Sequence, residues 1–231
     1  MDNVHENHRQ RMRKRYISHG LDSFHDHELL EMMLYYCYPR RDTNEIAHKF
    51  LQEFKSLHAL FDATPEALVA RLGCSENVAM LLNLMPAIAK RYLQSRWQDK
   101  PYLPEPMLVA DYLQGFFVDA LVEKFYVLCM DAQQRLNKAV LISKGTVDEV
   151  PVFIREIFKA VLDHNATGII LAHNHPSGSV TPSVSDNNLT MAIGQALRVL
   201  DVVVHDHIII AGNKYFSYES QTKGVVGGYL Q

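Results

Sequence analysis

The residues best suited to chemistry lie in one short stretch toward the C-terminal end of the chain. His173 and His175 are two residues apart and follow an apolar run, and Asp186 comes shortly after Pro182 and Ser183. In extended backbone, alternate side chains point to the same face, so the two imidazoles are expected to lie side by side. Two imidazoles and one carboxylate suit Zn²⁺, and three protein ligands leave the fourth tetrahedral position for water, as catalytic zinc sites do. A hard cation such as Mg²⁺ would require more oxygen ligands.

The spacing of these residues is more specific than their types. A His-x-His pair alone is a weak signal in a chain with 12 histidines, and Asp186 alone could be an ordinary acidic residue at a helix start. The full pattern is His-x-His, seven residues, Ser, two residues, Asp. His173, His175, Ser183 and Asp186 match it without a gap, so the sequence predicts a metal site here.

The segments around these residues alternate between strand and helix periodicity. Strands are expected at 124–130, 137–142, 167–172, 201–210 and 214–217, and helices at 152–165 and 186–200. The run 167–172 is short and continuously apolar, which is typical of a buried strand. Strands that alternate with helices predict a mixed α/β sheet, with the two histidines at a strand end and the aspartate in the first turn of the next helix.

The N-terminal half has helical periodicity from residue 26 to about residue 94. Thr64 and Pro65 are typical of a helix start, Gly73 should end that helix, and a new helix should follow, kinked at Pro86. This is the outline of a helix-hairpin-helix. Residues 95–106 contain three prolines and predict a linker, so we expect a helical domain at 1–94 and a second domain at 107–231.

The composition is that of an ordinary soluble globular protein, with 48% hydrophobic and 21% charged residues. The net charge of -3 produces no overall attraction to nucleic acid, so any such binding must be local. Three well-separated cysteines indicate a reducing compartment. A polar, basic start is unlike a signal peptide, and no apolar run reaches the ~20 residues of a membrane helix. We therefore expect a cytoplasmic protein with no membrane contact.

Five basic residues near the start of the chain have two interpretations. They form either a solvated helix or a small patch that binds phosphate groups, as in a possible DNA contact. These residues are Arg9, Arg11, Arg13, Lys14 and Arg15.

The metal-site pattern resembles that of the JAMM metalloproteases of the JAB/MPN type, which cleave peptide or isopeptide bonds. The flanking segments are similar to the bacterial RadC family over essentially the whole chain. These segments are HRQRMRKRY, PRRDTNEIAHKF, SKGTVDE (143–149), IREIF (154–158), HNHPSG (173–178), PSVSD (182–186) and HDHIIIAG (205–212). The resemblance implies a JAB/MPN zinc domain with a cytidine-deaminase-like sheet, preceded by a small helix-hairpin-helix-like domain.

The resemblance also implies roles for individual residues. His173, His175 and Asp186 would bind zinc, and Ser183 would stabilise the oxyanion of the tetrahedral intermediate. A glutamate on the first strand of the domain would be the general acid/base, and Glu123 lies there, directly before the run KFYVLCM.

Other residues compete for roles at the site. Glu156 is the rival acid/base, although we expect it to face solvent or to pair with Arg155, and Glu149 falls in a short loop. Either His205 or His207 could support a metal ligand or line the cleft, or both could be ordinary strand histidines.

Three classes of function remain open at this stage. The leading hypothesis is a zinc metallohydrolase that acts on a protein or peptide substrate. The alternative is a nucleic-acid-binding protein associated with DNA repair or recombination. The third is a non-catalytic interaction module, against which the intact ligand set argues. The predicted hairpin turn reads Leu72-Gly73-Cys74-Ser75 and lacks the second glycine usual in DNA-binding turns of this type, so a packing role is at least as well supported.

Overall fold

The computed structural model describes residues 4–97, 99–117, 122–145 and 152–226. The chain divides into two compact units, Met1–Ile88 and Ala89–Gln231. The boundary between them falls inside one helix, α6 (Glu76–Ser95). Independent folding of the regions 1–94 and 107–231 stays a prediction.

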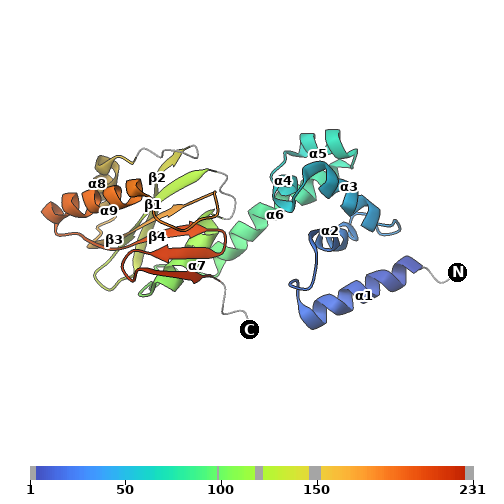
Figure 1. Cartoon of the computed structure of the whole chain (residues 1–231), viewed down its shortest axis with the longest axis horizontal. Coiled ribbons are helices and arrows are strands. Elements are labelled where there is room, and N and C mark those ends of the chain that lie inside the picture. Colours follow the sequence, from blue (N-terminus) through green and yellow to red (C-terminus); the bar gives the residue numbers. More distant parts are fainter. Residues whose placement is uncertain (1–3, 98, 118–121, 146–151, 227–231) are drawn as a thin grey trace. The chain divides into compact units, whose positions relative to one another are not determined.

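The first unit is built from helices (Figure 1). They are α1 (Val4–His19), α2 (Asp26–Leu34), α3 (Asn44–Phe54), α4 (Leu57–Phe61), α5 (Pro65–Leu72) and the first part of α6. One core joins α2 to α6, with fully or almost fully buried leucines at its centre: Leu30, Leu34, Leu60, Leu68 and Leu82. The helical periodicity expected from residue 26 onward is therefore confirmed.

The turn between α5 and α6 follows the predicted signals. The Thr64 side chain accepts a hydrogen bond from the Ala67 backbone N–H, which caps the start of α5. Gly73 ends the helix with φ of +64°, a left-handed conformation that favours glycine. Cys74 is buried in the core of the unit, so this turn has a packing role. Pro86 lies inside α6, as expected, and the kink there stays a prediction.

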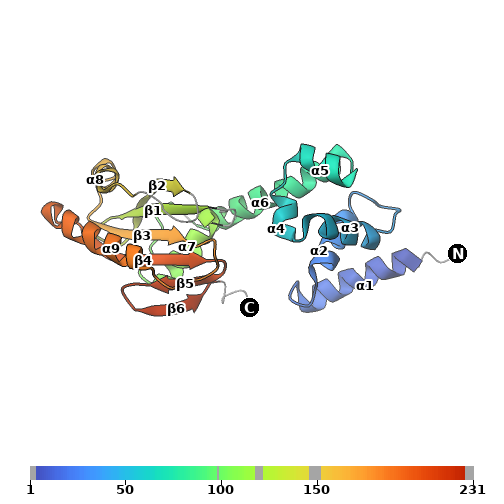
Figure 2. The ribbon, with the colours of Figure 1, turned by 45° about the horizontal axis from the view of Figure 1, so that its top comes forward.

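The second unit is a six-stranded mixed sheet in the order β2-β1-β3-β4-β5-β6, and Figure 2 shows the strands side by side in that order. The strands are β1 (Glu123–Met130), β2 (Leu136–Gly145), β3 (Gly168–Asn174), β4 (Val203–Ala211), β5 (Lys214–Ser217) and β6 (Thr222–Val225). Only β3 and β4 pair in parallel; the other neighbours are antiparallel. The mixed α/β sheet is thus confirmed. The strand β6 was not predicted from the sequence, because it is short and mostly polar.

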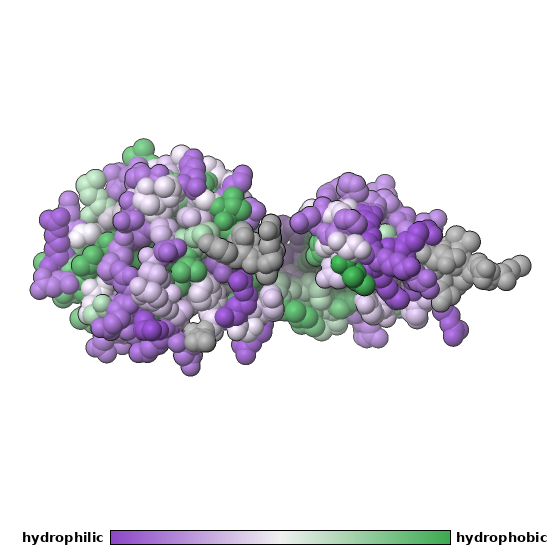
Figure 3. All heavy atoms as spheres, turned by 90° about the horizontal axis from the view of Figure 1, so that it is seen from below, coloured by the Kyte–Doolittle hydropathy of each residue, from purple (hydrophilic) through white to green (hydrophobic). Residues whose placement is uncertain are grey.

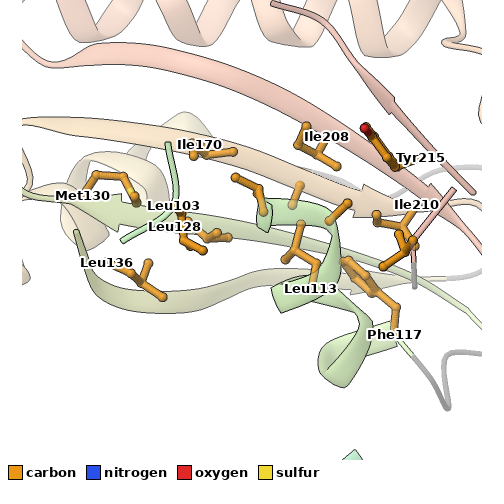
Figure 4. Close-up of a cluster of buried hydrophobic side chains, with 14 residues drawn as sticks. Leu103, Leu113, Phe117, Leu128, Met130, Leu136, Ile170, Ile208, Ile210 and Tyr215 are labelled. Carbon is orange, nitrogen blue, oxygen red and sulfur yellow. The ribbon is translucent and has the colours of Figure 1, made fainter. Parts of the chain in front are cut away.

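Helices cover both faces of this sheet. On one face, α7 (Pro106–Phe117) packs Leu113 and Phe117 against strand residues such as Ile170 (Figure 4). On the other face, α8 (Ile154–Asp163) and α9 (Val184–Leu197) pack against alternate strand residues such as Leu171. Consecutive residues of β3 therefore contribute to opposite cores, because strand side chains alternate. The buried strand predicted at 167–172 is β3, which runs from Gly168 to Asn174 with all seven residues buried.

The stretch expected to be a linker is partly built into this unit. The Leu136 backbone N–H donates to the Pro101 carbonyl (2.9 Å), and the Leu103 N–H donates to the Gln134 carbonyl (3.2 Å). The Leu103 side chain is 2% exposed in the core that α7 covers. The helix α7 was also not predicted, because the prolines around its start indicated a linker. Proline is nevertheless compatible with the first turn of a helix.

The surface and the cysteines agree with the composition. The face in Figure 3 shows hydrophilic residues interspersed with smaller hydrophobic patches. Within the described part of the chain, none of the helices has the length and hydrophobicity needed to cross a membrane. Cys37, Cys74 and Cys129 are free, and burial raises the pKa of the Cys129 thiol to about 11.

Candidate metal centre

Two histidines meet where β3 leaves the sheet. His173 is the next-to-last residue of β3 and is 4% exposed, and His175 follows the strand end. The parallel pairing with β4 continues past that end, because the His175 backbone N–H donates to the Ile210 carbonyl (2.8 Å). The two Nε2 atoms lie 2.9 Å apart. The expectation that both imidazoles share one face is confirmed.

Asp186 reaches the histidines from the first turn of α9. Its Oδ1 lies 3.2 Å from His173 Nε2, and its Oδ2 lies 3.6 Å from His175 Nε2. A capping box with Ser183 fixes the carboxylate: the Ser183 Oγ accepts from the Asp186 N–H (3.0 Å), and Asp186 Oδ2 accepts from the Ser183 N–H (2.7 Å). The sequence pattern Ser-x-x-Asp therefore works as a helix cap that also orients the aspartate toward His173 and His175.

The hydrogen bonds at the far sides of the rings test whether these residues suit a metal ion. The Nδ1 of His175 lies 2.7 Å from the Ser179 carbonyl, which can only accept, so Nδ1 carries the hydrogen. A neutral His175 then has a lone pair at Nε2, facing His173 and the carboxylate. The three ligand atoms lie within 4.8 Å of one another. Electron pairs that converge in this way require a cation or a shared proton, so these residues can hold a metal ion.

The acid-base properties of the cluster point the same way. Burial alone would raise the pKa of Asp186, but hydrogen bonds with His173 and His175 outweigh it and hold that pKa well below its usual range. The hydrogen bond with Asp186 raises the pKa of His175, and the negative charge of Glu123 adds to this. Both shifts result from the close approach of the carboxylate to the two imidazoles, which favours the ionised form of Asp186 and a positive charge on His175.

Glu123 is the first residue of β1, on the strand next to the histidines. The antiparallel register pairs Phe125 with His173, so Glu123, two residues earlier, lies along the same edge as His175. The predicted placement of Glu123 on the first strand is confirmed. Its role as acid/base stays a prediction.

Asn174 holds the start of β1 in place. Its side-chain carbonyl accepts from the Lys124 backbone N–H (2.8 Å), and its amide donates to the Val122 carbonyl (3.1 Å). These two bonds continue the β1–β3 pairing past the last backbone pair and enclose Glu123 on both sides. Asn174 was not among the site residues predicted from the sequence. The sequence signal for Asn174 was its position between the two histidines. Side chains alternate along a strand, so a residue between two site histidines points away from them.

The rival glutamates lie elsewhere. Glu156 is in the first turn of α8, with a side chain that is 44% exposed and a hydrogen bond from Arg155 Nε (3.3 Å). This is the solvent-facing, Arg155-paired position that the sequence predicted. Glu149 lies outside the described residues.

The hydroxyl of Ser183 has a structural partner. It donates to Asp186 Oδ2 at 2.7 Å while it accepts from the Asp186 N–H. To stabilise an oxyanion, the hydroxyl would have to leave this carboxylate, whose remaining bond from the Ser183 N–H would keep it in place. The oxyanion role therefore stays a prediction.

Of the two β4 histidines, His207 joins the site and His205 does not. His207 is 0% exposed, with Nε2 2.8 Å from His173 Nδ1 and Nδ1 2.6 Å from Thr190 Oγ1. Complete burial lowers the pKa of His207 well below its usual value. His205 instead packs over Gly168, where a Cβ would overlap its ring. Thr190 was missed, although it lies four residues after Asp186 and so shares its helix face.

The basic residues of α1 divide into two groups. Arg9 donates to three backbone carbonyls, those of Tyr38, Pro39 and Arg41, each at 2.7 Å. Arg15 donates to both carboxylate oxygens of Glu28. These two arginines attach α1 to the rest of the helical unit. The other three, which are exposed, are Arg11, Arg13 and Lys14.

A sheet that carries His-x-His at one strand end and Ser-x-x-Asp at the next helix start has the architecture of a JAB domain. Residues 103–224 match the family model described as RadC-like JAB domain. Three curated relatives are UPF0758 proteins. The protein from Fusobacterium nucleatum is 36% identical over 92% of this chain and 95% of its own length. The protein from Rhodobacter capsulatus is 34% identical (91% and 98%), and that from Pseudoalteromonas translucida is 37% identical (90% and 93%). The chain belongs to the RadC family.

Proposed function

We propose that this protein is a zinc-dependent hydrolase of the JAMM type that cleaves a peptide or isopeptide bond in a protein or peptide substrate. The observation that carries the proposal is the convergence of two imidazole nitrogens and one carboxylate oxygen within 4.8 Å, with the hydrogen bond at His175 Nδ1 leaving the Nε2 lone pair of that ring toward the other two groups. Nitrogen and carboxylate ligands in this number favour zinc over harder cations. Membership of a JAB-domain family is compatible with hydrolysis.

The residues around the ligands supply the remaining requirements of amide hydrolysis. Zinc bound by His173, His175 and Asp186 would act as a Lewis acid that activates water and polarises the scissile carbonyl. Glu123, whose charge acts on His175, would take a proton from water and deliver it to the leaving amine. The amine leaves readily only when protonated, so this transfer is the chemical reason for a glutamate at this position.

Metal content is the first test. Purified protein should contain about one zinc ion per chain, measured by elemental analysis, because the three ligands form a single site. The double variant His173→Ala, His175→Ala should contain almost none. Zinc content that is unchanged in this variant would refute the ligand assignment.

Turnover is the second test, with a matched pair of substitutions. Against a panel of peptides and isopeptide-linked substrates, Glu123→Gln should keep zinc and fold but lower turnover by ~10²-fold or more. Glu156→Gln removes the same charge from an exposed side chain of the same unit and should leave turnover near that of the wild type. If Glu156→Gln abolishes turnover and Glu123→Gln does not, the two roles are reversed.

A further inference from the structure

A chain of hydrogen bonds runs beneath the candidate metal site, from one ligand to another. It begins at His173 Nδ1, which lies 2.8 Å from His207 Nε2. The opposite nitrogen, His207 Nδ1, lies 2.6 Å from the hydroxyl of Thr190. That hydroxyl donates to the backbone carbonyl of Asp186, also at 2.6 Å. The side chain of the first ligand is thus connected to the main chain of the third.

The hydrogens in this chain can be assigned from its last member. The Thr190 hydroxyl has one hydrogen, and the Asp186 carbonyl can only accept, so that hydrogen is committed. Toward His207 the hydroxyl therefore acts as an acceptor, and His207 Nδ1 is the donor. In its neutral form His207 then has a lone pair at Nε2, which accepts from the Nδ1–H of His173. His173 is left with a lone pair at Nε2, facing His175 and Asp186.

The two rings are also held by their neighbours. The ring of Tyr218 is stacked on His207, with centroids 4.9 Å apart and planes 12° apart. The ring of Phe125 lies nearly parallel to that of His173, at 6.0 Å and 14°. The Tyr218 hydroxyl donates to the side chain of Asn187, the residue after Asp186, at 2.8 Å. Ring contacts from Phe125 and Tyr218 therefore hold both histidines of the hydrogen-bond chain in place.

We infer that His207 and Thr190 are positioning residues that hold His173 in the tautomer with the hydrogen on Nδ1, which leaves the lone pair of Nε2 for the metal ion. They act through His173 and make no contact with substrate themselves. The inference rests on the proposed function, because it assumes that His173, His175 and Asp186 bind zinc. Hydrogen-bond partners behind metal-ligating histidines fix the ring and its tautomer, and their loss weakens metal binding by about 10- to 100-fold.

Two substitutions of His207 separate tautomer control from simple packing. The amide of glutamine can occupy the position of Nε2 and accept from His173, whereas the amide of asparagine occupies the position of Nδ1 and cannot reach His173. Zinc affinity would be measured by competition with a chelator, and the fold of the metal-free variants by thermal unfolding. His207→Asn should weaken zinc binding by about 10- to 100-fold, and His207→Gln should stay within a few-fold of wild type.

A second pair keeps the test valid if changes at the buried His207 prevent folding. Thr190→Val removes the acceptor for His207 Nδ1, and Thr190→Ser retains it, at a side chain that is only partly buried. We expect weaker zinc binding for valine and near wild-type binding for serine. Nitrogen chemical shifts of His173 in the zinc-loaded wild type and Thr190→Ser should report the Nδ1–H tautomer.

The outcomes separate this inference from the proposed function. If the wild type binds zinc and His207→Asn or Thr190→Val binds it equally well, the positioning inference is wrong and the metal site stands. If His207→Gln is as weak as His207→Asn while both fold, the effect is packing, and the inference is again wrong. If the wild type binds no zinc, the proposed function fails and this inference fails with it.

Discussion

Replacing Asn174 with alanine would show how much of the candidate site depends on the two hydrogen bonds that the Asn174 side chain makes to the start of β1. Asn174 is 4% exposed, and its side chain makes two hydrogen bonds to the backbone of β1, to Lys124 N–H and to the Val122 carbonyl. A net hydrogen bond contributes about 1 kcal/mol, and a buried group left without a partner costs about 1–3 kcal/mol. Loss of both bonds should therefore lower the free energy of unfolding by about 2–4 kcal/mol.

The same substitution should affect turnover, because the two lost bonds enclose Glu123. A displacement of a catalytic group by ~1 Å can cost about 10²-fold in rate, so we expect Asn174→Ala to lower turnover by roughly 10- to 100-fold with zinc still bound. Chemical denaturation of the isolated variant would measure stability, and the same peptide substrate would measure turnover.

A matched control for this experiment is Asn137→Ala. The Asn137 amide also donates to a backbone carbonyl, that of His164 (3.2 Å), but it lies away from the ligands. It should cost about 1 kcal/mol in stability and leave turnover unchanged. If Asn174→Ala retains full turnover while Glu123→Gln is inactive, Asn174 does not position Glu123. If its stability is unchanged, the two bonds contribute no net free energy.

Three further predictions concern the helical unit and its connection. DNA binding, where present, should be weak and salt-sensitive, and a gel-shift salt titration should show it lost when the exposed basic residues of α1 are changed to glutamine. These residues are Arg11, Arg13 and Lys14. Tight, sequence-specific DNA binding that survives their replacement would contradict this prediction. The hydrogen bonds from Arg15 hold the pKa of Glu28 at about 2, below its ordinary value of 4.5. This pair therefore stabilises the folded unit above pH 4.5, and its contribution to the free energy of unfolding is lost as the pH falls toward 2. Acid unfolding followed by circular dichroism should show a smaller pH dependence in this range for Glu28→Gln, and an unchanged curve would count against the pair. In limited proteolysis, the first cut between the units should fall before Pro101. The Pro101 carbonyl accepts a hydrogen bond from Leu136, the first residue of β2, and the Leu103 N–H donates to the carbonyl of Gln134 in the preceding turn. A first cut between Pro101 and Leu103 would show that this attachment is weak.

The group of residues that can hold a metal ion could be predicted from the sequence because each of them is placed by local geometry. Strand alternation puts His173 and His175 on one face, and the Ser-x-x-Asp cap puts Asp186 three residues after Ser183 at a helix start. Strand alternation and the helix cap both depend only on residues close together in the chain, so no knowledge of the fold was required. The same holds for the buried strand β3, whose continuous apolar sequence allows burial on both faces.

Tertiary contacts decided which basic residues of α1 attach this helix to the rest of its unit. Spacing along the chain groups Arg9 with Arg11, Arg13, Lys14 and Arg15 as one patch. In the folded unit, Arg9 reaches carbonyls about thirty residues away and Arg15 reaches Glu28, because those groups come together only when α1 docks.

The surroundings of the ligands also required the fold. Glu123 lies at the same edge of the sheet as His175 because β1 pairs antiparallel with β3, a strand some fifty residues later in the chain. The side chain of Asn174, on β3, adds a hydrogen bond to this pairing. His207 meets Thr190 only because β4 lies parallel to β3 beneath α9. A sequence states which residue types are near in the chain, whereas a hydrogen bond between strands depends on register. Register is set by the packing of the whole sheet, so local patterns could name the candidate ligands but not the groups hydrogen-bonded behind them.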